Sequence, residues 1–383
     1  MDKLNIGISC YPVAGGSGIV ATELGLKLAE RGHQVHFIAY DLPFRLDKFR
    51  PNLFYHQVDT TSYQLFKYPP YTLTLAARMA EISCQYHLDI LHAHYAIPHA
   101  TAAFLSRQLT AHCCKPRVIT TLHGTDITLV GADKSYYDIT RFSIRSSDGI
   151  TAVSKYLADE TCREFKIKKH IEVIHNFVDI DRFRPGPPQN GCCRQQYVSL
   201  DEKFLCHISN FRPVKRVMDV IDIFEKVRRQ IPAKLLMIGE GPETMMVRRT
   251  VKKNHLEDHV IFLGAQSKVE EVLPCVDLFL LPSEEESFGL AALEALACGV
   301  PVIGSSGTGL VEVVDHGKDG FLFPVADTWS MANAAISLLK GEYDLNKFKK
   351  HGAEKAQALF NSEYIVDKYE KYYYQVMEET SGA

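Results

Sequence analysis

The sequence predicts an α/β protein built from two doubly wound domains that face each other across a cleft. Short apolar runs alternate with segments of helical period along the whole chain, which is the pattern of a parallel sheet covered by helices. The length of 383 residues exceeds the size at which one hydrophobic core usually stops growing. A stretch rich in proline and glycine, Arg184–Gly191, separates two halves that each repeat strand, glycine-bearing turn and helix.

The elements follow in order along the chain. Apolar runs bounded by turn residues predict strands, and the helical segments Ile19–Arg31 and Lys155–Phe165 lie between them. The expected strands of the first half are Ile6–Ser9, Val35–Ala39, Ile90–His92, Val118–Thr121, Gly149–Val153 and Ile171–Ile174. Those of the second half are Leu205–Ser209, Leu235–Ile238, Val260–Leu263, Leu278–Leu281, Val300–Gly304 and Gly320–Phe323.

The domain boundaries follow from these elements. We expect a first domain over residues 1–180 and a second over 190–361. The final helical segment, Ser362–Glu379, is rich in tyrosine, and we expect residues 362–383 to pack back on the first domain. In each domain a ligand is expected at the carboxyl ends of the strands.

The composition excludes several classes of protein. The 43 basic and 46 acidic residues give a net charge of −3 without long blocks of one sign, so no nucleic-acid or membrane partner is indicated. No apolar run is long enough to span a bilayer, and the N-terminus does not read as a secretory signal, so we expect a cytoplasmic protein. The ten cysteines show no metal-binding spacing and are expected to be reduced, buried thiols.

The strongest chemical signal is Glu284–Glu294 (EEESFGLAALE), in which Glu286 and Glu294 lie eight residues apart. This separation is a little over two helical turns, so we expect both carboxylates to share a helix face. The amides of Ser287–Gly289 are expected to lie at the helix start, where a diphosphate can bind. An acidic helix cap alone would explain one glutamate but not the whole group.

Two further segments follow strands. Asn210–Arg216 (NFRPVKR) supplies three cations suited to phosphate oxygens, although a solvated basic loop is an equal alternative from the residues alone. Gly15–Gly18 precedes a helix but does not match the glycine fingerprint of dinucleotide-binding proteins. Binding of a nicotinamide cofactor at this turn, with Asp41 on the cofactor ribose, is left barely open. His123 follows a strand within Thr120–Asp126, whereas His92 and His94 are expected to be structural.

These residues resemble the family 4, or glycogen-synthase-like, retaining glycosyltransferases, whose GT-B architecture consists of two Rossmann-like domains. The hallmark is a glutamate, seven residues and a second glutamate, here Glu286 and Glu294. Asn176–Asp179 with Phe183, Gly239–Glu243 and Gly299–Val302 match further family motifs in the same order, so the resemblance covers essentially the full chain.

The resemblance implies a role for each matching residue. Catalytic roles fall to His123, Lys215 and Glu286, with Glu286 on the sugar hydroxyls and Lys215 on the diphosphate. Glu294 is implied to hold the ribose. The family usually has arginine at the position of Asn210, and we infer that Arg212 takes over its phosphate contact. The implied donor-binding residues are Gly16, Asn210, Arg212, Lys215, Gly239, Glu286, Ser287, Phe288, Gly289 and Glu294.

Within the family, Cys10–Pro12, His94–Ala100 and Ser209–Arg212 resemble the subgroup that transfers N-acetylglucosamine from UDP-N-acetylglucosamine to L-malate in bacillithiol biosynthesis. Malate is a small dianion, so its site needs cations and hydroxyl groups. The expected acceptor-binding residues are Ser17, Tyr95, Thr125, Arg141, Ser154 and Lys155. Formation of a homodimer is left open.

The resemblance also implies retention of anomeric configuration. Because no carboxylate is placed as a covalent nucleophile, we expect front-face transfer. Asp179 and Asp181 mimic a metal-binding Asp-x-Asp pair, but we assign them to the linker and expect no metal or other cofactor, since helix starts and the Lys/Arg pair can neutralise the diphosphate. Three alternatives remain: a UDP-N-acetylglucosamine 2-epimerase, a family 4 transferase with another small acceptor, and a non-enzymatic nucleotide-sugar sensor.

Overall fold

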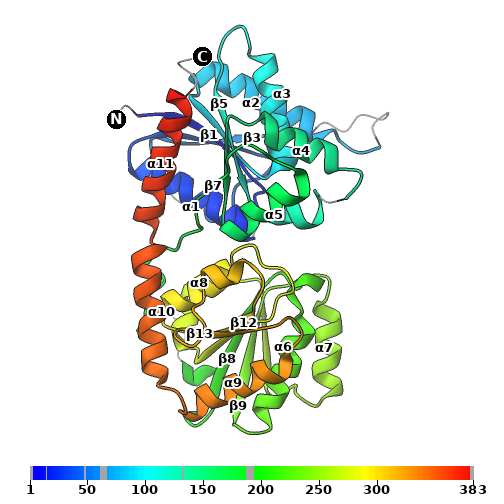
Figure 1. Cartoon of the computed structure of the whole chain (residues 1–383), viewed down its shortest axis with the longest axis vertical. Coiled ribbons are helices and arrows are strands. Elements are labelled where there is room, and N and C mark those ends of the chain that lie inside the picture. The colour runs from blue at the N-terminus through cyan, green and yellow to red at the C-terminus, as the bar shows by residue number, and fades with distance from the viewer. Residues whose placement is uncertain are drawn as a thin grey trace. The chain divides into compact units, whose positions relative to one another are not determined.

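The computed structural model describes residues 3–13, 15–46, 49–60, 67–131, 133–186 and 194–379. The chain divides into two compact units, Met1–Asn176 with Ser362–Ala383, and Phe177–Asn361. Each has a central sheet flanked by helices (Figure 1). Residues 177–180, expected in the first domain, belong to the second unit, and residues 187–191 of the expected linker lie outside the described residues.

The described part of the first unit contains a seven-stranded parallel sheet in the order β3-β2-β1-β4-β5-β6-β7. The strands are β1 (Asn5–Ser9), β2 (Gln34–Ala39), β3 (Leu53–Gln57), β4 (Ile90–His94), β5 (Arg117–Leu122), β6 (Gly149–Ala152) and β7 (Glu172–Val173). Every residue of β4 is buried, because helices cover both faces of a parallel sheet. The strand order reverses between β1 and β4, which is where doubly wound sheets bind ligands.

The helices of this unit connect its strands. They are α1 (Gly16–Glu30), α2 (Tyr71–Tyr86), α3 (Thr101–Leu109), α4 (Tyr137–Ser146), α5 (Lys155–Phe165) and α11 (Ser362–Glu378), with short π turns η1 (Ala96–Ala100) and η2 (Thr125–Leu129). Helix α5 begins where the Ser154 hydroxyl accepts a hydrogen bond from the amide of Leu157, 3.0 Å away. This contact satisfies an amide that has no acceptor within the helix.

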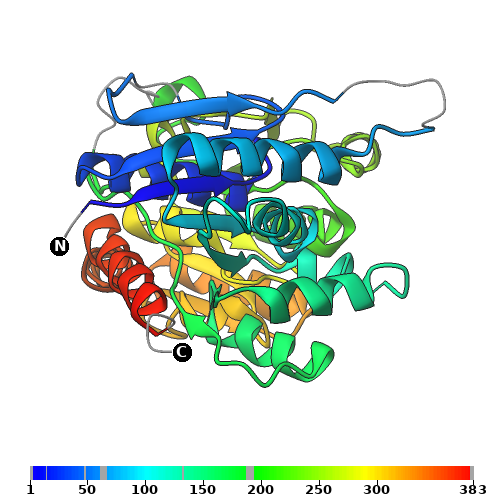
Figure 2. The same ribbon diagram turned by 90° about the horizontal axis from the view of Figure 1, so that it is seen from above.

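Helix α11 joins the first unit from the far end of the sequence. Figure 2 shows it, in red, beside the blue start of the chain. The Arg31 guanidinium, at the end of α1, contacts Glu363, Asp367 and Glu370 of α11. On the sheet side, the Tyr373 hydroxyl lies 2.8 Å from Nδ1 of His92. The helix is thus held by charges at its outer face and by a buried hydrogen bond at its inner face.

The described part of the second unit contains a six-stranded parallel sheet in the order β10-β9-β8-β11-β12-β13, which reverses between β8 and β11. The strands are β8 (Lys203–Ile208), β9 (Ala233–Ile238), β10 (Val260–Gly264), β11 (Leu278–Leu281), β12 (Val302–Ser305) and β13 (Gly320–Phe323). The helices are α6 (Val217–Arg228), α7 (Thr244–Lys253), α8 (Leu290–Ala297), α9 (Thr328–Lys340) and α10 (Leu345–Leu359). Short 3₁₀ turns are η3 (Arg194–Gln196), η4 (Pro213–Lys215), η5 (Val269–Glu271), η6 (Leu273–Cys275) and η7 (Gly309–Glu312).

The core of this unit lies between the sheet and helices α6 and α9. Val220, Phe224 and Val227 of α6 and Met331 and Ala335 of α9 are buried in one apolar cluster with the strands. Helix α9 begins at Asp327, whose carboxylate accepts from the Ser330 amide, and ends at Gly341 in the left-handed conformation that favours glycine. The predicted α/β class with parallel sheets is confirmed for both units.

Each strand expected from the sequence is present, with ends that differ by no more than two residues. The expected helix Ile19–Arg31 begins earlier, at Gly16. One strand was not expected, β3 at Leu53–Gln57. It lies at the sheet edge and is mostly half-buried, so it lacks the continuous apolar run that marks a central strand.

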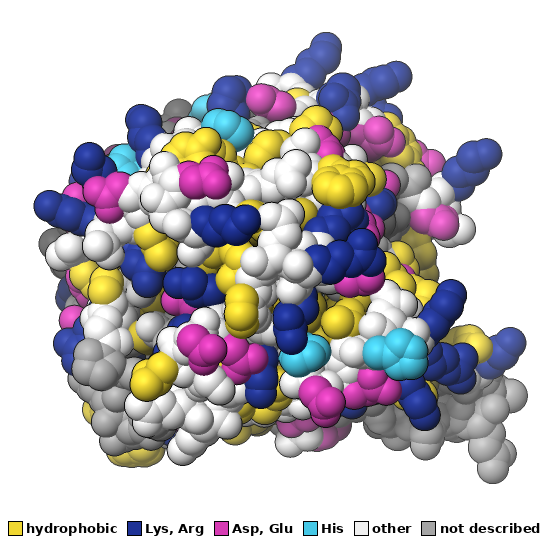
Figure 3. Space-filling model, turned by 90° about the horizontal axis from the view of Figure 1, so that it is seen from below, with side chains coloured by type: hydrophobic (Ala, Val, Ile, Leu, Met, Phe, Trp, Pro, Cys, Tyr) yellow, Lys and Arg dark blue, Asp and Glu magenta, His cyan; other side chains and the backbone are white. Residues whose placement is uncertain are grey.

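The surface carries charges of both signs. On the face shown in Figure 3, Lys and Arg side chains are interspersed with Asp and Glu, in keeping with the balanced composition. Among the described residues, no helix combines the length and the apolar character needed to cross a membrane.

The prediction that the cysteines are reduced, buried thiols is wrong for Cys84, Cys113 and Cys162. Cys84 and Cys113 form a disulfide, because α2 and the segment before β5 bring two residues together that are far apart in the sequence. Cys162 is a free thiol but exposed, whereas Cys10, Cys206 and Cys298 are free and buried as expected. Cys192 and Cys193 lie outside the described residues.

Candidate active site

Two loops at the switch point of the second sheet bring together a lysine and a glutamate. Lys215 ends η4 after β8, and Glu286 follows β11, the strand next to β8. The Nζ atom of Lys215 lies 2.7 Å from Oε2 of Glu286, and both side chains are largely buried. Because parallel strands end at the same edge, residues 71 positions apart meet here. Each side chain neutralises the charge of the other.

The structure corrects one part of the glutamate motif. Helix α8 begins at Leu290, so Glu286 lies in the loop before it and does not share a helix face with Glu294. Glu294 lies in the middle of α8 and is buried. The chain turns at Ser287–Gly289, and Gly289 adopts a φ of 97°. A side chain there would also approach the Leu310 side chain within 2.7 Å, so glycine is required for the turn that separates the two carboxylates.

The Gly239 turn packs directly against the loop after β8. A Cβ atom on Gly239 would lie 1.8 Å from the carbonyl oxygen of Ser209, and one on Gly241 would lie 1.9 Å from that of Asn210. The amide of Glu243 donates a hydrogen bond to the carbonyl of Phe211, 3.0 Å away. The glycines therefore hold the backbone that carries Asn210 and Arg212 against β9.

The cations of the basic loop have different surroundings. Arg216 is bound to Asp219, with 2.6 Å between Nε and Oδ2, and lies 3.7 Å from Glu284. Lys215 pairs with Glu286. Arg212 and Asn210 are exposed, and the described residues offer the Arg212 side chain no ion pair. Of the three expected cations, Arg212 is thus the one left available to an anion.

In the first unit, His123 lies at the carboxyl end of β5 against His94 at the end of β4. Its Nε2 atom is 2.9 Å from Nδ1 of His94, and the two rings stack with centroids 5.1 Å apart. The ring of Tyr95 lies 5.3 Å from that of His123. Burial lowers the pKa of His123 to about 3 and that of His94 well below its ordinary value, so both rings are neutral at physiological pH.

The buried pair fixes which nitrogen of His123 carries its proton. A neutral imidazole has one N–H and one bare nitrogen, so one of the two facing nitrogens must donate. Nε2 of His94 is buried and has no hydrogen-bond partner among the described residues. An orphaned buried N–H costs more than an orphaned lone pair, so His94 carries its proton on Nδ1 and donates it to His123. His123 then accepts this hydrogen bond at Nε2 and carries its own proton on Nδ1.

Asp126 shapes the loop that follows His123. Its carboxylate accepts hydrogen bonds from the amides of His123, Gly124 and Ala96, at 3.2, 3.0 and 3.0 Å. Burial raises the pKa of Asp126 to about 6, against the opposite effect of these amides. The contacts tie the ends of β4 and β5 together and so fix the placement of both histidines.

The expected acceptor residues lie at the carboxyl ends of four strands of the first sheet, with one exception. Ser17 lies in the first turn of α1 after β1, Tyr95 follows β4, Thr125 follows β5, and Ser154 and Lys155 follow β6. The Gly16 amide lies in the same first turn of α1 as Ser17, where helix amides lack intrahelical acceptors. Arg141 lies within α4.

Two of these residues are engaged elsewhere. The Ser154 hydroxyl caps α5, and the Lys155 ammonium pairs with Asp159 one helical turn later, 2.9 Å away and largely exposed. Arg141 differs from them, because its Nε atom is buried and has no hydrogen-bond partner among the described residues. A buried guanidinium nitrogen without an acceptor favours an anionic ligand.

The Asp179–Asp181 pair is built into a turn. The Oδ1 atom of Asp179 accepts a hydrogen bond from the amide of Asp181 at 3.0 Å, and the carbonyl of Asp179 accepts from the amide of Phe183 at 2.8 Å. This use of the first carboxylate supports the assignment of the pair to backbone structure.

Sequence reasoning missed three residues that shape the site. His94 was assigned a structural role only, Asp126 was not singled out, and Gly309 was not considered. The amide of Gly309 donates to the carbonyl of Glu286 at 2.7 Å and so holds the glutamate loop. The sequence does carry a signal for Asp126, because a carboxylate three residues after a histidine at a strand end can accept hydrogen bonds from the loop amides between them. It carries no signal for the contact between Gly309 and Glu286.

Comparisons with known proteins agree with this arrangement. Residues 14–182 match the profile of glycosyltransferase family 4, and residues 194–355 match that of glycosyl transferases group 1. The chain is 48% identical over 377 residues to the N-acetyl-alpha-D-glucosaminyl L-malate synthase of Bacillus anthracis, covering 98% of both chains. The chain belongs to glycosyltransferase family 4.

This family 4 enzyme also has more distant sequence relatives and solved structures of similar fold. It is 27% identical to an uncharacterized glycosyltransferase of Methanocaldococcus jannaschii, covering 90% of this chain and 92% of the other. Its fold is similar to that of the sucrose-phosphate synthase from Thermosynechococcus elongatus, with a TM-score of 0.82, 21% identity and coverage of 99% and 100%. HepE of Anabaena, crystallised with UDP and glucose, gives a TM-score of 0.82 at 17% identity, with 96% and 98% covered. The similar structures confirm the GT-B fold, and the family matches together with the 48% identical relative confirm the transferase class.

Proposed function

We propose that this glycosyltransferase moves N-acetylglucosamine from UDP-N-acetylglucosamine to the hydroxyl of L-malate, with retention and without a metal ion. The substrates rest on the relative whose name is N-acetyl-alpha-D-glucosaminyl L-malate synthase, since identity of 48% extends over 98% of both chains. The observation that carries the site is the ion pair between Lys215 and Glu286 at the switch point of the second sheet.

Donor binding separates this pair. The diphosphate of the donor is a stronger partner for Lys215 than one carboxylate is, because it offers several anionic oxygens. Glu286 is then released to accept hydrogen bonds from the sugar hydroxyls. Exposed Arg212 supplies a second cation for the phosphate. The pair thus keeps both side chains poised without leaving either charge unneutralised in the free enzyme.

The chemical step is a front-face displacement. The bond between the malate oxygen and the sugar C1 forms while the bond between C1 and the phosphate oxygen breaks, and the malate proton passes to a phosphate oxygen of the departing UDP. Lys215 and Arg212 stabilise the charge that grows on the leaving diphosphate. Neutral His123 donates its Nδ1–H to a sugar oxygen, because its lowered pKa leaves it without a positive charge.

The acceptor site lies at the strand ends of the first unit. The buried, unpartnered Nε of Arg141 supports its role as the clamp for a malate carboxylate. Tyr95, Thr125 and Ser17 supply hydroxyl groups there. Ser154 and Lys155 contribute less to malate binding, because the Ser154 hydroxyl caps α5 and the Lys155 ammonium pairs with Asp159. A cytoplasmic location belongs to the same proposal and is checked by cell fractionation. Light scattering decides whether the protein forms the homodimer that the sequence analysis leaves open.

The decisive experiment measures UDP release from UDP-N-acetylglucosamine with a panel of hydroxy acids in the presence of EDTA. Of the hydroxy acids in the panel, we expect only L-malate to give UDP release, and we expect EDTA to leave the rate unchanged. Glu286→Ala and Lys215→Ala should each lose turnover. Release without any acceptor would indicate a hydrolase, and conversion of the donor into its C2 epimer without UDP release would indicate an epimerase. Loss of activity in EDTA would refute metal independence. Covalent sugar trapped on a carboxylate would overturn the front-face step.

A further inference from the structure

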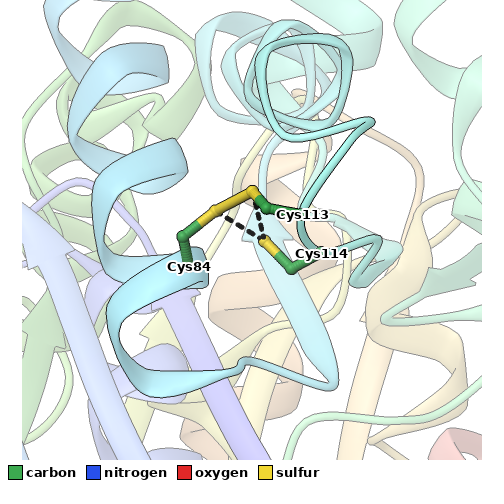
Figure 4. Close-up of side chains that lie close together, drawn as sticks. All are labelled: Cys84, Cys113 and Cys114. Carbon is green, nitrogen blue, oxygen red and sulfur yellow. Dashed lines mark hydrogen bonds between the residues drawn. A yellow bond between two sulfur atoms is a disulfide. The ribbon is translucent and has the colours of Figure 1, made fainter.

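Three sulfur atoms meet in the first unit, and we call Cys84, Cys113 and Cys114 the sulfur triad. Cys84 lies in the last turn of α2, and the other two lie between α3 and β5. Figure 4 shows the three side chains converging from these two segments. Cys84 precedes β4 and Cys114 precedes β5, so the triad lies at the amino ends of these parallel strands. It is therefore separate from the site at their carboxyl ends.

The backbone holds the adjacent cysteines in place. The amides of Cys113 and Cys114 both donate to the carbonyl of Thr110, at 2.9 and 3.0 Å. Cys84 and Cys113 form the disulfide, and the Sγ of Cys114 lies 3.0 Å from that of Cys84 and 3.8 Å from that of Cys113. Since α2 and α3 pack in one apolar cluster, the two segments keep the sulfurs together.

The surroundings of the triad differ from those of an inert structural disulfide. Cys113 is exposed, and Cys84 and Cys114 are half-buried, so solvent reaches the bond. His112 and Lys115, which flank the adjacent cysteines in the sequence, are exposed as well. Exposed disulfides are the labile ones, and in a reducing compartment they form transiently.

From this juxtaposition we infer that the sulfur triad is a thiol–disulfide exchange site, in which three sulfurs share one disulfide. The Cys114 thiolate attacks Sγ of Cys84, and the bond between Cys84 and Cys114 forms as the bond between Cys84 and Cys113 breaks. Cys113 leaves as a thiolate and takes up the proton that Cys114 gave to solvent. The number of disulfides is unchanged, so the step needs no outside oxidant or reductant.

The exchange delivers a free thiol to the exposed position. A low-molecular-weight disulfide, written RSSR, then reacts with the Cys113 thiolate: the bond between Cys113 and SR forms, the S–S bond of RSSR breaks, and RS⁻ leaves. The triad is thus a modification site for small disulfides. It is independent of the proposed sugar transfer, because none of its residues belongs to that site.

The first test maps the free thiol in the wild-type protein, purified without reductant. The protein is alkylated with iodoacetamide and digested with trypsin, and the peptide Gln108–Arg117 is fragmented to place the label. We expect label on Cys113 in some molecules and on Cys114 in others. The exposed free thiol of Cys162 serves as the internal control for the reagent. Label confined to Cys114 would overturn the inference.

The second test uses matched variants. Cys113→Ser should retain a disulfide between Cys84 and Cys114, so Cys114 should no longer be labelled. Cys114→Ser should retain the disulfide between Cys84 and Cys113, so Cys113 should not be labelled. Cys84→Ser should take up glutathione disulfide, used as the probe, at Cys113. Full alkylation of Cys84 and Cys114 in a Cys113→Ser protein that melts like wild type would contradict the exchange. So would zinc that copurifies with wild type and protects all three sulfurs.

Discussion

The two histidines at the ends of β4 and β5 show how one buried hydrogen bond can set the chemistry of a neighbouring side chain. His94 touches no solvent and is therefore a positioning residue, whose Nδ1 lies 2.9 Å from His123. Its effect is to fix the proton of His123 on Nδ1. The neighbouring carboxylate of Asp126 accepts hydrogen bonds from the backbone amides of His123 and Gly124.

Substitution of His94 tests this assignment. In His94→Asn the side-chain amide nitrogen can occupy the place of Nδ1, whereas in His94→Gln it can reach only the place of Nε2. We expect His94→Asn to keep most of kcat and His94→Gln to lose up to about 100-fold, since misplaced reacting groups cost that much. The nitrogen NMR shifts of the His123 ring should report a proton on Nδ1 in wild type. A proton on Nε2 there would refute the tautomer.

Arg141 is the residue that should distinguish acceptor from donor. Arg141→Ala removes a charge-assisted hydrogen bond of about 1.5 to 3 kcal/mol, so the KM for malate should rise by roughly 10- to 100-fold with little change in the KM for the donor. Arg145→Ala is the matched control, because Arg145 lies one turn further along α4 and donates to the carbonyl of Lys166. Equal effects on both KM values would exclude Arg141 as the clamp.

At the scale of elements, Arg31 contacts three carboxylates of α11, while Lys27 and His33 each contact one of them. The hydrogen bond from Arg31 lowers the pKa of Glu363, and the same guanidinium neutralises Asp367 and Glu370. Its side chain is only 18% exposed, unlike those of ordinary surface ion pairs. Three carboxylates on one face of a helix repel one another once their common cation is removed.

Arg31→Ala should therefore loosen the docking of α11. We expect a loss of about 1 to 3 kcal/mol in the free energy of unfolding, because the partners lie between the exposed and the buried cases. The measurement is urea unfolding followed by circular dichroism. Lys350→Ala is the control, since its pair with Glu354 is 75% and 65% exposed and should matter little. Equal losses in both variants would contradict the special role of Arg31.

At the scale of the whole molecule, the buried histidines make the protein sensitive to acid. Burial lowers the pKa values of His92, His99 and His123 to about 3 and holds the pKa of His94 well below its ordinary value. Histidines in the unfolded chain take up protons near pH 6.5, while these do not. Their contribution to stability is therefore complete above about pH 6.5 and is lost as the pH falls toward about 3.

Two buried carboxyls, Asp126 and Asp319, act in the opposite direction, because burial raises the pKa of each. Burial raises the pKa of Asp126 to about 6, so Asp126 takes up a proton in the folded protein at a higher pH than in the unfolded chain. This protonation stabilises the folded state as the pH falls from about 6 to the ordinary pKa range of aspartate. The four histidines outweigh the two carboxyls, so the melting temperature should fall from about pH 7.5 to about pH 5. The free energy of unfolding should fall by up to about 1.4 kcal/mol per pH unit for each histidine. A thermal-unfolding series in matched ionic strength measures this. An unchanged melting temperature would show that the histidines titrate normally.

The chain by itself determined the elements and their order, because short apolar runs and helical periods carry the parallel-sheet pattern locally. It also determined the family through Glu286, Lys215 and their neighbouring motifs, whose order along the chain is a linear property. The half-buried edge strand β3 carried too weak a pattern to be predicted. Only the tertiary structure decided which distant residues meet: Lys215 with Glu286, His94 with His123, Arg31 with α11, and Cys84 with Cys113 and Cys114. The reason is that such contacts depend on strand order and helix packing, which bring together side chains that no local pattern relates.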